Sequence, residues 1–203
     1  MKVIGIAGGV ASGKSFVTEG LKQLGAKTID ADVVAHEVLR EPAVKKKLHE
    51  RWGDDVLDDD GEINRSAVAR IVFAPTAKAA DELTFLEQTV HPRIGERLNQ
   101  QVEELRATET QAVVLDAAVM FKAGWDRFCD IIVFVDATDE KRLERAVQRG
   151  WTQEQFESRE EAQEMLETKR SRADVVIDNS DSVENTTRQL REFWKQMTWM
   201  NDE

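Results

Sequence analysis

The sequence is short of several features, and each shortage excludes a class of protein. Its 203 residues include a single cysteine, Cys129, so the chain cannot form an internal disulfide, as is usual for proteins of a reducing cytoplasm. No apolar run approaches the roughly 18 residues that a membrane-spanning helix needs. The first residues also lack the basic segment, apolar segment and cleavage site of a signal peptide. We therefore expect a cytoplasmic protein with no membrane partner.

Basic residues are in the minority as well. The chain has 28 lysines and arginines against 39 aspartates and glutamates, which gives a formal net charge of −11 at pH 7. A protein that holds nucleic acid on a broad surface needs many cations to replace the counterions, so we expect no nucleic-acid partner. A small anionic ligand is compatible with this balance, because a few local cations and backbone amides can dominate one cleft.

What the sequence does contain is a series of apolar, β-branched runs, most of them separated by segments of helical pattern. Such continuous runs are typical of a parallel sheet that helices cover on both faces, and they predict an α/β fold. The five predicted strands are residues 2–7, 27–31, 111–117, 130–137 and 174–179.

The segments outside these strands indicate how a single domain over residues 1–203 is organised. We expect a core of residues 1–35, 108–138 and 172–203, a helical insertion over 36–107 and a polar helical hairpin over 139–171. The first helix should begin at Lys14 and end at Gly25 as its C-cap. Within the insertion, Asn64 or Ser66 should lie near a helix cap, and Pro92 should kink or restart a long helix.

The strongest motif directly follows the first predicted strand. Gly8-x-x-x-x-Gly13-Lys14-Ser15 matches the P-loop pattern in full. The two glycines let the backbone turn its N–H groups toward an anion, and the helix that follows adds its positive dipole end. Lys14 should reach the β- and γ-phosphates of a nucleotide, and Ser15 should ligate Mg²⁺. The predicted nucleotide-binding residues here are Gly8, Gly9, Ala11, Ser12, Gly13, Lys14, Ser15 and Phe16.

Carboxylates at the ends of predicted strands favour a small-molecule kinase over a GTPase, whose Asn-Lys-x-Asp motif is missing. Asp30 and Asp32 close the second strand, where two residues of spacing would point both side chains the same way. One of them could take the proton of an acceptor hydroxyl, although Asp32 could also be a helix N-cap. Asp116 ends the third strand and is suited to hold Mg²⁺ directly or through water.

Arginines in the polar hairpin supply the remaining part that a kinase needs. Arg142, Arg145 and Arg149 follow one helical stripe, and we favour Arg145 and Arg149 as the pair that contacts phosphate oxygens. The alternative is that these arginines are solvated or paired with Glu144 or Asp139. A lone histidine such as His91 is, from its pattern alone, usually structural.

Several motifs together resemble the dephospho-coenzyme A kinase family over nearly the full chain. They are "IGIAGGVASGKS", "LGAKTIDADVVAHEV", "DDDGEINRSAVARIVF", "HPRI", "RLERAVQRG" and "REEAQEMLETKRSRADVVIDN". The last segment keeps the family spacing at Arg159, Gln163, Lys169, Ala173, Asp174 and Asn179.

The resemblance implies ATP-dependent phosphorylation of the ribose 3′-hydroxyl of dephospho-coenzyme A, the last step of coenzyme A synthesis. It implies a three-layer P-loop kinase fold with a helical coenzyme A-binding insertion and a helical lid, with ATP and Mg²⁺ as cofactors. By position, Asp32 corresponds to the catalytic base, Arg145 to the lid arginine, and Lys14 and Ser15 to the pair that binds phosphate and Mg²⁺. His91 falls in the family's coenzyme A-binding region. Together with the carboxylates at the strand ends, this gives Asp30, Asp32, His91 and Asp116 as the predicted substrate-binding residues.

One segment departs from the family pattern. Where the family usually has Asp-x-Pro-Leu-Leu-Phe-Glu, this chain has Asp116 followed by Ala-Ala-Val-Met-Phe-Lys, so Ala118 replaces the proline and Lys122 the acidic residue. Two other interpretations of the P-loop stay open at this point. One is a nucleoside or nucleoside monophosphate kinase, and the other is a nucleotide-binding switch that transfers no phosphoryl group.

Overall fold

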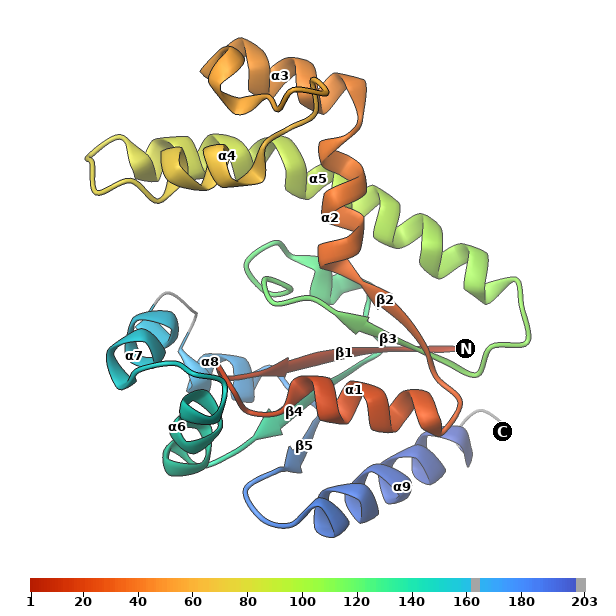
Figure 1. The fold of residues 1–203 in the computed structure, drawn as a ribbon. Helices are drawn as coiled ribbons and strands as arrows, with labels where there is room; N and C mark the ends of the chain where they lie inside the picture. Colours follow the sequence, from red (N-terminus) through yellow and green to blue (C-terminus); the bar gives the residue numbers. More distant parts are fainter. Residues whose placement is uncertain (162–164, 200–203) are drawn as a thin grey trace. The chain divides into compact units, whose positions relative to one another are not determined.

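The chain forms two compact units. The computed structural model describes residues 1–161 and 165–199, and it divides into one unit of Met1–Asp30 with Gln101–Glu203 and a second of Ala31–Gln100 (Figure 1). The first unit contains the sheet and the P-loop, and the second is helical. None of the described helices is long and apolar enough to cross a membrane.

A five-stranded sheet forms the centre of the first unit. All of its strand pairs are parallel and their order is β2-β3-β1-β4-β5, which confirms the α/β expectation. The strands are β1 (Lys2–Gly8), β2 (Lys27–Asp30), β3 (Ala112–Asp116), β4 (Ile131–Asp136) and β5 (Val175–Asp178). Each lies where an apolar run predicted it.

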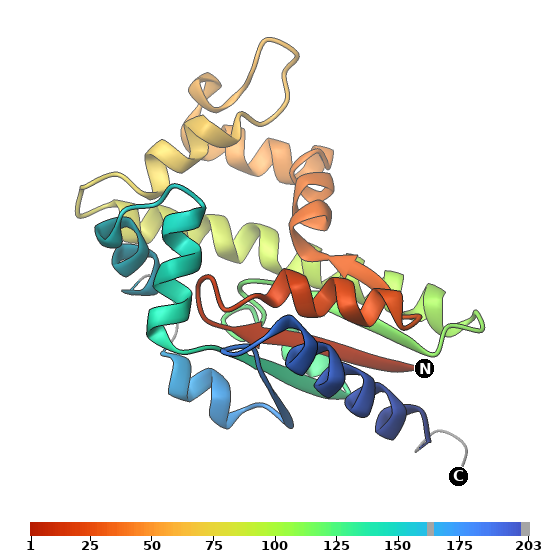
Figure 2. The same ribbon diagram turned by 60° about the horizontal axis from the view of Figure 1, so that its bottom comes forward.

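Helices α1 (Lys14–Gln23) and α9 (Val183–Trp199) cover one face of this sheet (Figures 1 and 2). Alternate strand side chains such as Ile4, Val114 and Val133 meet Val17 of α1 and Leu190 of α9 in one buried core. The complete cluster is Ile4, Ile6, Val17, Leu21, Ala26, Ala112, Val114, Val133, Val135, Ile177, Leu190, Phe193 and Met197.

The opposite face of the sheet is covered by the chain that follows β3. A Cβ added to Gly5 of β1 would lie 2.7 Å from both Met120 Sδ and Cys129 Sγ, so this segment packs directly on the strand backbone. Short η2 (Trp125–Phe128) lies in the same segment, and α8 (Leu166–Ser171) also packs against β1. With both faces covered, the inner strands β1 and β3 can be apolar along nearly their whole length, whereas the edge strands β2 and β5 each have one buried residue.

Glycines follow two helices of the first unit, and the sequence predicted the first of them, Gly25. Gly25 follows α1 with φ 115°, and the N–H groups of Gly25 and Ala26 donate to the carbonyls of Lys22 and Leu21, which is a Schellman motif. Gly150, with φ 81°, separates α6 (Asp139–Gln148) from α7 (Gln153–Glu161). Gln163 of the predicted late motif lies outside the described residues.

The second unit is built from α2 (Ala31–Leu39), α3 (Pro42–Trp52), η1 (Asp54–Val56), α4 (Arg65–Val72) and most of α5 (Ala79–Arg106). Glu41, just before α3, accepts hydrogen bonds from Arg93 and Arg97 of α5, at 2.9 and 3.0 Å. Asn64 is the N-cap of α4, because its side chain accepts from the Ala67 N–H at 3.1 Å.

Of the two outcomes predicted for Pro92, a kink or a restart of the long helix, the restart is wrong and the kink stays a prediction. The chain is helical on both sides of this residue, and α5 continues through it. Proline removes one backbone donor inside a helix. Burial of Ile94 and Leu98 beyond the proline, at 3% and 0% exposure, stabilises the helical continuation.

Candidate active site

The P-loop has the backbone geometry that its glycines predict. Gly8 ends β1 with φ 154°, and Gly13 precedes α1 with φ 99°. A Cβ at Gly13 would lie 2.1 Å from Asn179 Nδ2, so no side chain fits there. Ala11 also has a positive φ of 57°, and its strained conformation lies in the segment that must enclose an anion.

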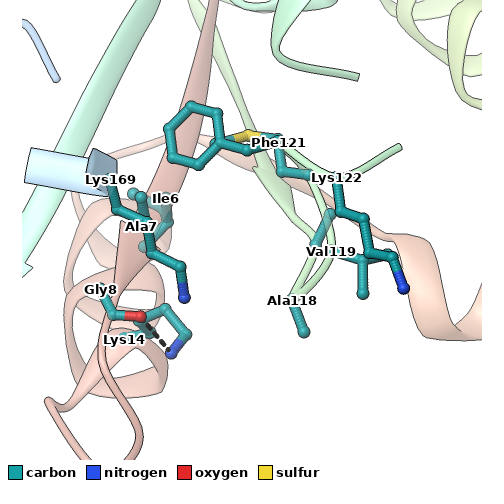
Figure 3. Close-up of a pocket in the computed structure, with 11 residues that line it drawn as sticks. Ile6, Ala7, Gly8, Lys14, Ala118, Val119, Phe121, Lys122 and Lys169 are labelled. Atoms are coloured by element: carbon teal, nitrogen blue, oxygen red, sulfur yellow. Dashed lines mark hydrogen bonds between the residues drawn. The ribbon is translucent and has the colours of Figure 1, made fainter. Parts of the chain in front are cut away.

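Lys14 holds its ammonium group over this loop. Its Nζ donates to the carbonyls of Gly8 and Gly9, at 3.3 and 3.0 Å (Figure 3). Burial, and then the positive charge of Lys169, lower the pKa of Lys14 to about 8, while the carboxylate of Asp116 acts in the opposite direction. A positive charge held in such a place gains more from a bound anion than an exposed one would.

Arg145 and Asn179 hold the far end of the loop. Arg145, on α6, donates from Nη1 to the Ser12 carbonyl at 3.0 Å and from Nη2 to the Asn179 carbonyl at 2.6 Å. Asn179 Nδ2 donates to the same Ser12 carbonyl at 2.7 Å, and Thr186 Oγ1 donates to Asn179 Oδ1. The guanidinium group of Arg145 thus joins the P-loop to the segment that follows β5.

A second arginine of the same stripe joins the loop to α7. Arg142 is only 3% exposed and pairs with Glu160 at 2.5 Å and with Asp139 at 2.7 Å. Glu160 also accepts from the backbone N–H of Val10, at 3.0 Å. One backbone N–H of the loop therefore already donates to a carboxylate, as is expected of a loop that binds anions.

A pocket lies beside the loop, at the carboxyl ends of β1 and β3 (Figure 3). Open α/β sheets bind their ligands at this edge. In Figure 3 the Lys169 side chain runs toward Gly8 and Lys14, and Lys122 lies on the opposite side. The lining residues are Ile6, Ala7, Gly8, Lys14, Ala117, Ala118, Val119, Met120, Phe121, Lys122 and Lys169.

Carboxylates meet at the same edge of the sheet. Asp30 and Asp116 are register partners at the ends of β2 and β3. No group of three or more histidine, cysteine or acidic residues in the described part of the chain could hold a metal ion. The donor set nevertheless suits Mg²⁺, which is usually bound by one or two protein oxygens together with substrate phosphates and water. The exposed hydroxyl of Ser15 and the half-buried carboxylate of Asp116 are such oxygens.

The structure brings together most of the predicted nucleotide-binding residues. Gly9, Ala11 and Ser12 form the loop, and Ser12 Oγ is buried without a hydrogen-bond partner among the described residues. Ser15 and Phe16 are exposed in the first turn of α1. Arg149 caps the end of α6, where its guanidinium carbon lies 6.0 Å from the centre of the Trp151 ring.

Two predicted substrate residues, Asp32 and His91, belong to the helical unit. The expectation that Asp32 continues the second strand is wrong, because β2 ends at Asp30 and Asp32 is exposed in the first turn of α2. The alternation of strand side chains therefore cannot align it with Asp30. His91 is half-buried in α5, next to Pro92.

Sequence reasoning assigned no role to three residues that the structure places at the loop or the pocket. Asn179 binds the loop, Glu160 receives one of its amides, and Lys169 lines the pocket. Lys169 and Asn179 do belong to the late motif whose spacing resembles the dephospho-coenzyme A kinases, so that motif was the available signal.

Comparisons with known proteins agree with this geometry. The family model described as dephospho-CoA kinase matches residues 2–185. A dephospho-CoA kinase of Symbiobacterium thermophilum is 38% identical over 199 residues, which cover 96% of this chain and 81% of the relative. One of Carboxydothermus hydrogenoformans is 35% identical over 202 residues, or 98% of this chain and 96% of the relative.

The solved structures include a similar chain at comparable identity. TT1252 from Thermus thermophilus matches with a TM-score of 0.77 and 32% identity, and the match covers 96% of this chain and 97% of that one. The sequence and structural matches agree over nearly the whole length, and so the chain belongs to the dephospho-CoA kinase family.

Proposed function

We propose that this chain transfers the γ-phosphoryl group of ATP to the ribose 3′-hydroxyl of dephospho-coenzyme A, giving coenzyme A and ADP. In this reaction the 3′-oxygen forms a bond to the γ-phosphorus as the bond from that phosphorus to the β,γ-bridging oxygen breaks. The hydroxyl proton passes to a carboxylate and from there to solvent. Membership of the dephospho-CoA kinase family supports the choice of acceptor.

The observation that carries the proposal is the P-loop with Lys14 over it. Lys14, Lys169 and Gly8 line one pocket at the sheet edge. The negative charge of Asp116 raises the pKa of Lys14 and so favours its ammonium form. Lys14 binds the β- and γ-phosphates, and Arg145 orders the loop through the Ser12 carbonyl. Ser15 and Asp116 hold Mg²⁺, which when bound neutralises charge on the phosphate oxygens.

Asp32 acts as the base toward the acceptor hydroxyl, a role that the family resemblance supports. Its side chain is exposed on the first turn of α2, where a substrate can reach it. Asp30 and His91 help bind the acceptor. The helical insertion, predicted as 36–107, holds the coenzyme A portion, and residues 139–171 with Arg149 form a lid over the nucleotide.

The experiment that tests this proposal is a panel of acceptors. Purified protein with Mg-ATP is offered dephospho-coenzyme A, nucleosides and nucleoside monophosphates, and ADP release is measured for each. We expect turnover with dephospho-coenzyme A. Turnover with a nucleoside or nucleotide instead would favour that kinase class, and nucleotide binding without ADP release on any acceptor would favour a switch.

A further inference from the structure

The pocket beside the P-loop contains a buried lysine that the family assignment gave no role. Lys169, on α8, is 5% exposed and lines this pocket together with Gly8 and Lys14. Lysine is rarely buried to this extent in a folded protein. Figure 3 shows its side chain running along the strand residues Ile6 and Ala7 toward Gly8, on the same side of the pocket as Lys14.

The position of α8 explains how the sequence brings this ammonium group to the loop. The helix packs against β1, whose carboxyl end leads into the P-loop. The next residue, Arg170, is 53% exposed and pairs with Asp136 at the end of β4. Successive residues of α8 therefore face opposite surroundings, with the Lys169 charge directed into the pocket and the Arg170 charge outside it.

Two ammonium groups in one pocket repel each other, and the burial of Lys169 strengthens this repulsion because less water screens its charge. After burial, the positive charge of Lys169 is the second largest cause of the lowered pKa of Lys14. An anion that contacts both groups removes this repulsion. The pocket lies at the carboxyl ends of β1 and β3 and is lined by Lys14, the residue that reaches the terminal phosphates of a nucleotide bound along the loop.

We propose that Lys169 binds the γ-phosphoryl group of ATP together with Lys14 and holds it for transfer. The assignment rests on the proposed function for the identity of the nucleotide, and it makes Lys169 a contact that ATP makes and ADP does not. Its charge would also stabilise the negative oxygens of the phosphoryl group as that group leaves ADP.

The test compares how tightly ATP and ADP bind to four proteins. These are the unmodified chain, Lys169→Met, which keeps the length of the side chain without its charge, Lys169→Arg, which keeps the charge, and Lys195→Met as the control. Lys195 is an exposed lysine of α9, outside the proposed lid. Dissociation constants are measured with Mg²⁺ and no acceptor. Charged hydrogen bonds contribute enough to binding that we expect Lys169→Met to weaken ATP by about tenfold or more. The same variant should change ADP affinity by less than about threefold.

The charge-retaining variant and the control complete the pattern. Lys169→Arg should restore most of the preference for ATP, and Lys195→Met should leave both affinities unchanged. Equal weakening of ATP and ADP by Lys169→Met, or no weakening of either, would overturn the assignment. Thermal unfolding reports whether each variant folds, and Lys169→Gln carries the same comparison should the methionine variant not fold.

The two proposals fail in different ways. The dissociation constants of ATP and ADP are measured without an acceptor. A selective loss of ATP affinity in Lys169→Met would therefore support the assignment of Lys169 even if dephospho-coenzyme A were not phosphorylated. Conversely, turnover of dephospho-coenzyme A with an unchanged ratio of these constants in the variant would keep the reaction and remove Lys169 from the phosphoryl site.

Discussion

The surroundings of Lys14 make its ammonium group a favourable site for phosphate. Its ammonium group donates to two carbonyls of its own loop and lies near the cations Lys169 and Arg149 and the acids Asp116 and Glu160. Burial and the neighbouring cations together outweigh the acids and lower the pKa of Lys14. In the free protein its charged form is therefore less stable than that of a solvent-exposed lysine. A polyphosphate reverses this balance.

The affinity for ATP should therefore fall as the pH rises above about 8. Below the lowered pKa of Lys14, which is about 8, the free protein already holds the ammonium form. Bound phosphate raises that pKa, so binding above pH 8 takes up a proton and becomes weaker by up to about tenfold per pH unit. Titrations of ATP between pH 7 and 10 measure the slope.

The matched control is Lys14→Arg, because its guanidinium group stays charged over this range. Its affinity for ATP should be lower overall but nearly independent of pH. A flat profile in the unmodified protein would show that Lys14 is not the group that titrates with nucleotide binding.

Asp32 is the residue on which the chemical step depends in this account. In Asp32→Asn the side chain keeps its size but can no longer accept a proton, so turnover should fall by about a hundredfold or more. ATP affinity should stay within about threefold, since Asp32 is assigned to the acceptor. Glu37→Gln, an exposed carboxylate-to-amide change on the same helix, should leave activity unchanged. Normal turnover in Asp32→Asn would remove it from its role.

At the scale of elements, the inner strands β1 and β3 could be predicted because they are buried along nearly their whole length and form continuous apolar runs. The edge strands β2 and β5 are more exposed, and only short apolar runs marked them. Gly13 could be predicted for a local reason, since the P-loop pattern places a glycine where the backbone needs a positive φ, which is 99° in the structure.

The errors arose where tertiary structure overrides local signals. Asp32 follows a strand so short that the chain is already helical at Ala31. Pro92 lies in a helix whose later turns are anchored by buried Leu98 and by the ion pair of Arg97 with Glu41. The burial of Lys169 was not predicted either, because the late motif marked only its spacing and a lysine among polar helical residues does not indicate burial.

The N-terminus of α4 offers a test of one element. The sequence left Asn64 and Ser66 as alternative caps, and the structure has Asn64 accept the Ala67 N–H. Asn64→Ala should lower the free energy of unfolding by about 1 kcal/mol. In a protein of this size that corresponds to a decrease of about 2–4 °C in Tm, measurable by thermal unfolding.

Ser66→Ala serves as the comparison. Ser66 is exposed in the first turn of α4, so its replacement should change the unfolding free energy by less than about 0.5 kcal/mol. A larger loss in Ser66→Ala than in Asn64→Ala would contradict the capping assignment.

At the scale of the whole molecule, an acidic chain concentrates positive charge in one pocket. The net charge is −11, yet Lys14, Lys122 and Lys169 all line the cavity beside the P-loop. Local charge of this kind can attract an anionic substrate even to a protein of the same overall sign. Lys122 lies where the sequence resemblance implies an acidic residue, so the pocket has a positive charge at this position instead of a negative one.

The most direct test of the account is to identify the product that the protein makes from Mg-ATP and dephospho-coenzyme A. Phosphorus NMR of the purified product distinguishes a phosphomonoester on the ribose 3′-oxygen from one at any other position. We predict a 3′-phosphomonoester formed in equal amount to ADP. No new phosphomonoester at millimolar substrates, or one at another position, would contradict the account.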